Sequence, residues 1–294
     1  MKKFERRLAR RYRVSPGGPF RLRDWNPADT AGLAFSKHDA EKLLQKGIER
    51  LTALQDKLYA QDRWSLLVVV QGIDAAGKDG TIKHVMSGVN PQGVQVHAFK
   101  APSAEELDHD YLWRAARCLP GRGEIGLFNR SHYEEVLVAR VHPEILASQR
   151  LPPELVTKNI WRQRYEDIND FERHLARSGT VIRKFFLNVS RKEQKKRLLA
   201  RLDDPEKNWK FSATDAGERA LWKDYMRAYE EMIDATSTPW APWYAIPADN
   251  KWFTRLVVGD VIVATLEGLD LAYPKVDKAK RRELAKVRKA IARS

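Results

Sequence analysis

A short apolar strand that runs directly into a glycine-rich turn and a helix is the feature that most limits what this chain can fold into. Residues 65–70, SLLVVV, are mostly apolar and partly β-branched, which is typical of a strand buried inside a sheet. Residues 72–78, GIDAAGK, follow almost at once and have the spacing G-x-x-x-x-G-K of a phosphate-binding loop. Because a helical pattern comes next, the loop has the strand–loop–helix context that this spacing requires.

The residue types in this loop suit the binding of a phosphate group. Gly72 and Gly77 let the backbone bend so that N–H groups point at phosphate oxygens, and the following helix offers its positive N-terminal end to the same anion. Lys78 is expected to reach a phosphate as a point charge. A chance glycine turn after a strand is the alternative interpretation. The phosphate-binding residues predicted for the loop and the first helical turn are Gly72, Ala75, Ala76, Gly77, Gly80 and Thr81.

One position departs from the usual form of the motif. After Gly-Lys a Ser or Thr normally supplies a hydroxyl to Mg²⁺, whereas this chain has Asp79, and the loop itself contains Asp74. Two carboxylates in an anion-binding loop would repel phosphate unless a cation lay between them. We therefore predict one or more Mg²⁺ ions held by Asp74 and Asp79. Alternatively, Asp79 only caps the helix and interacts with its dipole, which does not exclude the metal.

The length and composition indicate a folded protein. The chain has 294 residues, 43% of them hydrophobic, and can build one large domain with additions or two small ones. The single cysteine, Cys118, excludes an internal disulfide and suits the cytosol. The apolar run Leu66–Val70 is far too short to span a membrane, and no apolar segment follows the basic N-terminus. We expect a cytoplasmic protein that does not contact a membrane.

The positive charge of the chain is concentrated at its two ends. The formal net charge is +14, of which residues 1–13 carry +6 and residues 275–294 carry +7, leaving +1 for residues 14–274. Because the body is almost neutral, the charge does not indicate a specific nucleic-acid partner. The basic ends either hold an acidic polymer or are solvated flanks. We divide the chain into a basic arm and N-terminal loop (1–35), a main domain (36–274) and a basic C-terminal tail (275–294).

Apolar runs and helical spacings alternate along the chain. Besides the strand at 65–70, short strands are expected at 94–99, 124–128, 181–189 and 243–246. Helices are expected from Ser36 to the first strand, at 81–88, from a capping box at Ser103 to about 118, at about 152–177, and at 252–269. Strands that alternate with helices favour a parallel sheet covered on both faces, so the predicted fold class is α/β with three layers, α/β/α.

Polar side chains after the strand at 124–128 form a second candidate site. In enzymes with a phosphate loop an acid commonly follows such a strand and holds Mg²⁺, but here the residue is Asn129, so we infer that the metal-binding charge has moved to the loop. The fork of Arg130 suits bidentate contact with a phosphate, and an ordinary salt bridge is the alternative. Glu134 and Glu135 begin a helix, where acids are favoured anyway, so only one of them need be functional.

A highly charged helix–turn–helix over residues 190–222 is the third candidate site. In nucleotide kinases a mobile helical lid brings Arg and Lys over the phosphates and excludes water. The alternative is a solvated helix surface. Trp209 within the hairpin is expected to contact either a nucleobase or the core. The cations of this segment are Lys192, Lys195, Lys196, Arg197, Arg201, Lys207 and Lys210.

Four segments together resemble the polyphosphate kinase 2 family. They are GIDAAGKDGTIK (72–83), LFNRSHYEEVLVARV (127–141), DDPEKNWKFS (203–212) and APWYAIPADNKW (241–252), and the similarity covers roughly residues 12–274. This family is similar to thymidylate kinase in fold and moves phosphate between inorganic polyphosphate and nucleotides. The resemblance implies catalytic or metal-binding roles for Asp74, Lys78 and Asp79, phosphate contacts for Lys83 and Arg130, and a lid that contains Arg201, Lys207 and Lys210.

Residues 129–134, NRSHYE, bear on which nucleotide accepts the phosphate. Family members restricted to nucleoside diphosphates tend to have Asp at the position of Asn129 and Asn at that of Glu134. This chain therefore resembles the class III group, which accepts monophosphates and diphosphates, and Asn129 and Glu134 are counted among the nucleotide-binding residues. Glu135 departs from the Asp commonly seen there. The basic ends lie outside the shared pattern, so no role transfers to them.

The resemblance implies an enzyme that uses inorganic polyphosphate and Mg²⁺ to convert AMP to ADP and ADP to ATP, with guanine nucleotides as further candidates. It also implies assembly into a homo-oligomer, and in-line transfer in which Lys78, Arg130 and the lid neutralise charge. Two alternatives stay open. One is an ordinary ATP-dependent nucleotide or small-molecule kinase, which shares the loop but not the donor. The other is a polyanion- or nucleic-acid-binding protein with a degenerate loop, against which the intact Lys78 argues.

Overall fold

A parallel β-sheet forms the centre of the molecule. The structure is a computed structural model that describes residues 8–33, 37–206, 208–210 and 213–293. Within these residues five parallel strands form one sheet in the order β2-β3-β1-β4-β5. The five predicted strands are confirmed as β1 (Ser65–Gln71), β2 (Val94–Ala98), β3 (Ile125–Asn129), β4 (Thr180–Asn188) and β5 (Trp243–Pro247).

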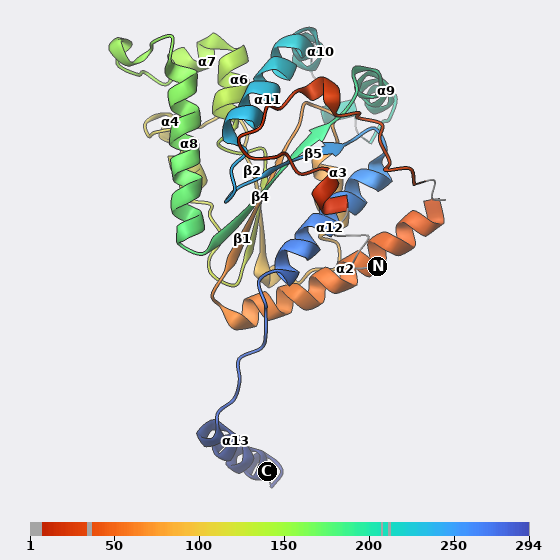
Figure 1. Cartoon of the computed structure of the whole chain (residues 1–294), viewed down its shortest axis with the longest axis vertical. Coiled ribbons are helices and arrows are strands. Elements are labelled where there is room, and N and C mark those ends of the chain that lie inside the picture. Colours follow the sequence, from red (N-terminus) through yellow and green to blue (C-terminus); the bar gives the residue numbers. More distant parts are fainter. Residues whose placement is uncertain (1–7, 34–36, 207, 211–212, 294) are drawn as a thin grey trace.

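Two layers of helices cover opposite faces of this sheet (Figure 1). One layer contains α2 (Lys37–Gln61), α3 (Lys78–Val85) and α12 (Lys251–Glu267), and α12 packs on both of the others. The other layer contains α6 (Glu134–Val141), α8 (Ile160–Arg177) and α11 (Trp222–Thr236), which pack on one another. Because both faces are covered, all seven residues of β1 are buried. The predicted three-layer α/β/α fold is confirmed.

The helix predicted from Ser103 to about 118 is interrupted. The capping box is present, since the Ser103 hydroxyl accepts a hydrogen bond from the backbone N–H of Glu106, and α4 (Ala104–Leu107) follows it. The Asp110 carboxylate then accepts a hydrogen bond from the backbone N–H of Leu112 at 2.9 Å. Such a local turn competes with helix formation, so the chain forms a separate α5 (Trp113–Ala116).

The helix predicted over about 152–177 begins only at Ile160, as α8. Pro153–Leu155 form a separate 3₁₀ turn, and the Thr157 hydroxyl accepts a hydrogen bond from the backbone N–H of Asn159 at 3.2 Å. These local bonds turn the chain before the helix starts. Three helices were not predicted, α7 (Pro143–Ser148), α11 and α13 (Lys278–Ile291).

The N-terminal segment, residues 8–33, packs against the β5 edge of the sheet. Leu8, Tyr12 and Val14 are buried in the same core as the strands, and Arg13 forms an antiparallel bridge with Tyr244 of β5. Further along, the backbone N–H of Phe20 donates to the Asp234 carboxylate of α11 at 2.7 Å. The first part of the chain is thus joined to its last strand and to α11.

A fully buried ion pair connects β4 to α8. The ammonium of Lys184 donates three hydrogen bonds, to Glu172 Oε2 (2.6 Å), to the Tyr133 hydroxyl (2.7 Å) and to the Thr236 carbonyl (2.8 Å). The Tyr133 hydroxyl in turn donates to Glu172 Oε1 at 2.9 Å. Burial lowers the pKa of Lys184 to about 8. Every N–H of the ammonium has an acceptor, which is the condition under which a buried charge is tolerated.

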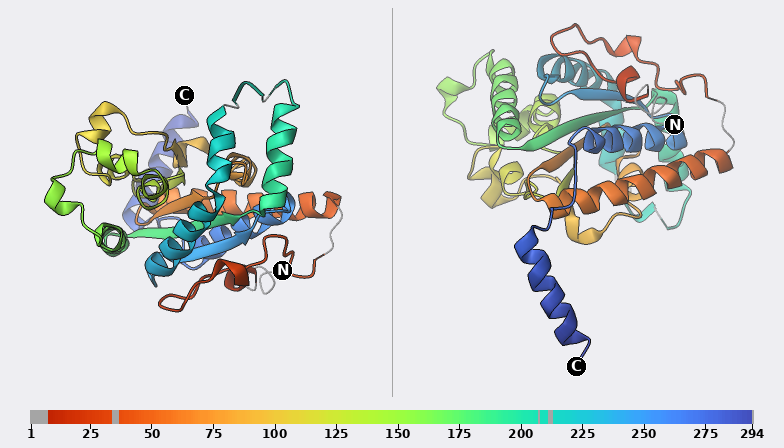
Figure 2. Two further views of the ribbon diagram at one scale, coloured as in Figure 1. Left: turned by 90° about the horizontal axis from the view of Figure 1, so that it is seen from above. Right: turned by 60° about the horizontal axis from the view of Figure 1, so that its bottom comes forward.

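Two parts of the chain stand out from the layered body (Figure 2). Helices α9 (Arg191–Leu202) and α10 (Ala213–Ala220) form a hairpin above the carboxyl ends of the strands. Helix α13 (Lys278–Ile291) projects from the other end of the long axis. Within the described residues, none of the helices has both the length and the apolar character needed to cross a membrane.

Candidate active site

The predicted phosphate loop connects β1 to the start of α3, and its two glycines serve different needs. Gly77 has φ +105°, a backbone conformation that side chains rarely allow, and it directly precedes α3. Gly72 is required by close packing, because a Cβ there would lie 3.0 Å from the Cβ of Ala76 and 3.1 Å from the carbonyl oxygen of Leu187 in β4. Ala75 also has a positive φ of 60°. The loop therefore has a strained but closely packed backbone.

Lys78 lies at the base of the loop, and its side chain is buried. The ammonium donates to the carbonyl oxygen of Gly72 at 2.6 Å. Burial and, to a smaller extent, the nearby charge of Arg130 lower the pKa of Lys78 to about 8, although Glu134, Asp74 and Asp79 oppose the shift. Charges from both predicted sites therefore meet around this lysine.

Each of the two predicted metal-binding carboxylates has a partner from another element. Asp79 Oδ1 accepts a hydrogen bond from the Asn129 amide at 2.6 Å, which joins the start of α3 to the end of β3. Asp74 Oδ2 lies 3.2 Å from the guanidinium of Arg201 in α9. The side chain of Asp74 is about one-third exposed, so it remains accessible from the pocket described below.

Arg130 follows β3 in a strained backbone conformation, with φ +62°. Its backbone N–H donates to the carbonyl oxygen of Val70 in β1, which fixes this turn beside the phosphate loop. Its guanidinium pairs with Glu134 Oε2 at 3.2 Å. A left-handed conformation in a residue other than glycine persists only when its surroundings determine it, and such residues often lie in functional sites.

Arg197 of α9 is a site residue whose role the sequence did not distinguish from those of its neighbours. Its side chain is only 9% exposed. The guanidinium donates to the carbonyl oxygens of Ala75 (3.2 Å) and Ala76 (2.9 Å) in the phosphate loop, and to the carbonyl oxygen of Asp249 (3.1 Å) after β5. Gln194 adds a hydrogen bond to the carbonyl oxygen of Asp74 at 3.2 Å. The first half of α9 is thus attached to the phosphate loop, and Arg201 near the end of the helix pairs with Asp74.

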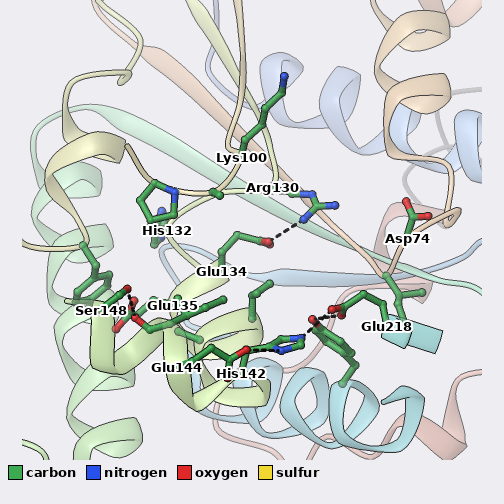
Figure 3. Close-up of a pocket in the computed structure, with 18 of the residues that line it drawn as sticks. Asp74, Lys100, Arg130, His132, Glu134, Glu135, His142, Glu144, Ser148 and Glu218 are labelled. Atoms are coloured by element: carbon green, nitrogen blue, oxygen red, sulfur yellow. Dashed lines mark hydrogen bonds and ion pairs between the residues drawn. The ribbon is translucent and has the colours of Figure 1, made fainter. Parts of the chain in front are cut away.

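A pocket of about 780 Å³ opens beside the loop, between the turn that follows β3, the segment 100–114 and the helices α6, α7, α9, α10 and α11 (Figure 3). One end contains Asp74, Arg130 and Glu134. At the other end His142 lies between two carboxylates, 3.2 Å from Glu144 and 2.9 Å from Glu218. Because Glu218 belongs to α10, this contact ties the hairpin to the pocket wall. Acids and cations line the pocket together, and Tyr225 and Tyr229 of α11 also contribute to its wall.

The structure brings most of the predicted site residues together. Gly72, Asp74, Arg130 and Glu134 line the pocket, and Lys78, Asp79, Asn129 and Arg201 lie next to them through the contacts given above. Ala75, Ala76, Gly77 and Gly80 form the loop and the first turn of α3.

The remaining predicted residues are not among those that these contacts bring together. The Thr81 hydroxyl is buried and donates to the Gly77 carbonyl oxygen, and Lys83 is exposed further along α3. Lys207 and the Lys210 side chain fall outside the described residues. The predicted alternative in which Trp209 contacts the core is wrong, because this side chain is 72% exposed. Glu135 is buried, and its carboxylate lies 3.1 Å from Arg164 on α8, so it joins two helices of the pocket wall.

A parallel sheet, a phosphate loop with its lysine, and a helical hairpin carrying arginines over that loop define the class of phosphate-loop kinases. The chain belongs, more particularly, to the polyphosphate kinase 2 family, since the family model of that description matches residues 34–274. It is therefore an enzyme of the phosphotransferase class.

Known relatives cover nearly the whole chain. An "ADP-polyphosphate phosphotransferase" of Rhodopseudomonas palustris is 51% identical over 96% of this chain and 98% of its own length. An "AMP/ADP-polyphosphate phosphotransferase" of Meiothermus ruber is 47% identical over 92% of this chain and 97% of its own. The crystal structure of polyphosphate kinase 2 from Arthrobacter aurescens superimposes with a TM-score of 0.85 at 43% identity, covering 95% of this chain and 96% of the other.

Proposed function

We propose that this enzyme transfers phosphate from inorganic polyphosphate to nucleotides, converting AMP to ADP and ADP to ATP. The observation that carries the proposal is the meeting of Lys78, Arg130 and Arg201 at one end of a pocket of nucleotide size. The relatives named above are described as acting with polyphosphate on ADP, and on AMP or ADP. Because Lys78, Arg130 and Arg201 all lie beside the phosphate loop, the phosphates of donor and acceptor would meet there.

In the proposed reaction a phosphate oxygen of the acceptor attacks the terminal phosphorus of the donor in line with the bond that breaks. This oxygen is largely deprotonated near neutral pH, so the chain need not supply a strong general base. The protein contributes positioning and charge neutralisation. Lys78 would exchange its loop carbonyl partner for phosphate oxygens, Arg130 would bind the transferred group through its fork, and Arg201 would approach from the hairpin.

Asp74 and Asp79 are proposed to hold Mg²⁺. Both offer hard oxygen donors next to the loop, and Mg²⁺ in kinases uses one or two carboxylates while phosphates and water complete its shell. Bound there, Mg²⁺ would offset the negative charge of the phosphates. The neutral Asn129 leaves the acidic charge on the loop, where Asp79 is oriented by the Asn129 amide.

We expect kcat/KM for polyphosphate to fall as the pH rises above about 8. The pKa of Lys78 lies near 8 because of burial, so above that pH the free enzyme loses this cation. Bound phosphates favour the charged ammonium, so the fall in kcat should lie at higher pH. The check is a pair of pH profiles, with Lys78→Arg as the comparison, because a guanidinium stays protonated. A kcat/KM that stays flat across the alkaline range would contradict the assignment.

We expect Arg197→Ala to lower kcat by about 10²-fold, because a loop that loses its supports no longer holds its N–H groups in the reactive geometry. Lys196→Ala is the matched control, since Lys196 is the adjacent residue on the same helix and its side chain is 80% exposed. The control should retain kcat. The measurement is steady-state kinetics together with thermal unfolding. Equal kcat in both variants would show that Arg197 does not position the loop.

Glu134 is proposed to determine whether AMP is accepted. The reactive phosphate must reach the same cations whether the acceptor is AMP or ADP, so AMP must bring its ribose one phosphate closer to the loop. Glu134 lines the pocket beside these cations, with its side chain 14% exposed and paired with Arg130, and we propose that the ribose of AMP reaches it. A shorter side chain at position 134 would therefore lose its contact with bound AMP. Bound ADP, whose ribose lies further from the loop, would not lose a contact.

We therefore expect Glu134→Asn to reduce kcat/KM for AMP by about 10–100-fold, the range found when a pocket contact is lost. Activity with ADP should stay within a few-fold and serves as the internal control. Initial rates with each acceptor at saturating polyphosphate provide the measurement. A parallel loss with both acceptors would mean that Glu134 supports Arg130 in general and does not select the acceptor.

The function itself is tested by incubating the purified protein with AMP, long-chain polyphosphate and Mg²⁺, without ATP, and separating the nucleotides over time. ADP followed by ATP is the expected result, and chelation of Mg²⁺ should abolish both. Formation of ATP from ADP alone would keep the donor and overturn the proposal for AMP. Product that forms only when ATP is the donor would replace the proposal with an ordinary ATP-dependent kinase.

Three further properties belong to the same proposal. Guanine nucleotides are proposed as additional acceptors, to be tested by replacing AMP with GMP in the same incubation. A homo-oligomer is proposed, which light scattering of the purified protein would detect. A cytoplasmic location is proposed, which is supported by the single cysteine and would be tested by cell fractionation.

A further inference from the structure

The C-terminal helix α13 is a cationic helix that stands apart from the domain (Figure 1). It begins after Asp277, whose carboxylate accepts a hydrogen bond from the backbone N–H of Lys280 at 2.7 Å and caps the helix. All residues from Ala272 to Arg293 are exposed. Residues 275–294 contain nine Lys or Arg and two acids. The phosphate-transfer site makes no use of this charge.

Four of these cations lie in a row along one face of α13. Lys278, Arg282, Lys286 and Lys289 follow one another at spacings of four, four and three residues, which places them on one side of a helix, over a length of about 16 Å. In the described part of the chain their side chains form no ion pair, and the one acid within the helix, Glu283, pairs with Lys280 on another side. A row of like charges without counter-charges repels itself and attracts a polyanion.

The row lies far from the phosphate loop. Helix α12 starts directly after the carboxyl end of β5, on the side of the site, and its 17 residues extend about 25 Å toward the opposite end of the domain. The connection to α13 leaves from that opposite end, as Figures 1 and 2 show. A short polyphosphate in the site cannot reach the row, whereas a long one can contact both.

We propose that α13 is a second attachment site for long-chain polyphosphate, which raises the local concentration of donor at the active site. This inference rests on the proposed function, in which polyphosphate is the donor. A polymer held at two places dissociates less readily than one held at a single place, because the second contact forms within the same complex. Charge complementarity favours this occupant over a membrane. The apolar stripe of α13, Leu284, Val287 and Ile291, has no aromatic anchor and has Lys280 on the same side.

The test compares the full chain with a variant that carries Lys278→Gln, Arg282→Gln, Lys286→Gln and Lys289→Gln. At low salt the KM for long-chain polyphosphate should rise by about tenfold or more, while kcat and the KM for tripolyphosphate stay unchanged. The matched control carries Leu284→Gln and Val287→Gln, which keeps every charge, and it should behave like the unmodified chain. Circular dichroism checks that both variants keep their helix content.

Several outcomes would overturn the inference. An unchanged KM for the long donor would do so, and so would an equal rise for tripolyphosphate, which would indicate an effect on the active site itself. A third outcome would favour a membrane as the partner of α13. In that case the full chain would sediment with anionic vesicles, the Leu284/Val287 variant would not, and the four-glutamine variant would have an unchanged KM for polyphosphate.

A failure of the proposed function can be distinguished from a failure of this inference, because retention of labelled polyphosphate on a filter by the protein requires no turnover. If no variant forms nucleotide from polyphosphate, retention that is lost in the four-glutamine variant still supports the attachment site. Equal retention by both proteins overturns it.

Discussion

Lys78→Ala is expected to lower kcat by about 10²–10³-fold with polyphosphate as donor, comparable to removal of one preorganised donor to a developing negative charge. The ammonium is held 2.6 Å from the Gly72 carbonyl oxygen, at the point where the loop meets α3. No other described lysine occupies this position, and water cannot replace a fixed cation there. Steady-state rates with ADP and long-chain polyphosphate provide the measurement.

This loss should occur without a loss of stability. Because burial lowers the pKa of Lys78 to about 8, the folded protein holds the charged form less favourably than water does, so removing the charge should not promote unfolding. Lys46→Ala on the exposed surface of α2 is the control and should retain full activity. A Lys78→Ala variant with near-normal kcat would overturn the assignment of the loop.

Glu172→Gln is expected to have the largest effect on folding, lowering the free energy of unfolding by about 3–5 kcal/mol. The substitution leaves the Lys184 ammonium buried without its counter-charge, although its hydrogen bonds to Tyr133 and Thr236 can remain. Burial alone would raise the pKa of the Glu172 carboxyl, and the nearby charge of Lys184 reverses this, so the pKa is lowered and the carboxylate is charged in the folded protein. Urea unfolding followed by circular dichroism measures the effect.

The control for this prediction lies on the same helix. Glu166 of α8 forms an exposed pair with Arg162 at 3.9 Å, and Glu166→Gln should change stability little because water screens such pairs. The double variant Glu172→Leu, Lys184→Met should recover part of the loss, since replacing both charges leaves neither one unpaired. Equal midpoints for Glu172→Gln and Glu166→Gln would show that the buried pair contributes little.

The strands could be predicted from the sequence because a parallel sheet covered on both faces buries every residue of its central strands. The run at 65–70 therefore reads as continuous apolar sequence, and β1 is buried along its whole length. Helix boundaries were harder, because side chains such as Asp110 and Thr157 bond to the nearby backbone and turn the chain locally. The strand order has no signal in a single sequence.

The site was predictable where the chemistry depends on residue type and spacing, as in the loop and Arg130. It was not predictable where the outcome depends on burial. Arg197 and Lys196 are adjacent in a segment crowded with cations, yet one is 9% exposed and bonded to the loop, and the other is 80% exposed. Helical periodicity could have shown which of the two side chains is buried only if the position of α9 against the loop were already known.

The packing of the N-terminal segment has a consequence for how the protein is made. The backbone N–H of Phe20 bonds to Asp234, 214 residues later in the chain, and that of Val14 bonds to the carbonyl oxygen of Trp243 in the last strand. The N-terminal segment must therefore wait until α11 and β5 have been synthesised before it can dock. Until then Leu8 and Tyr12 remain available to chaperones, and the domain can close only after β5 has left the ribosome.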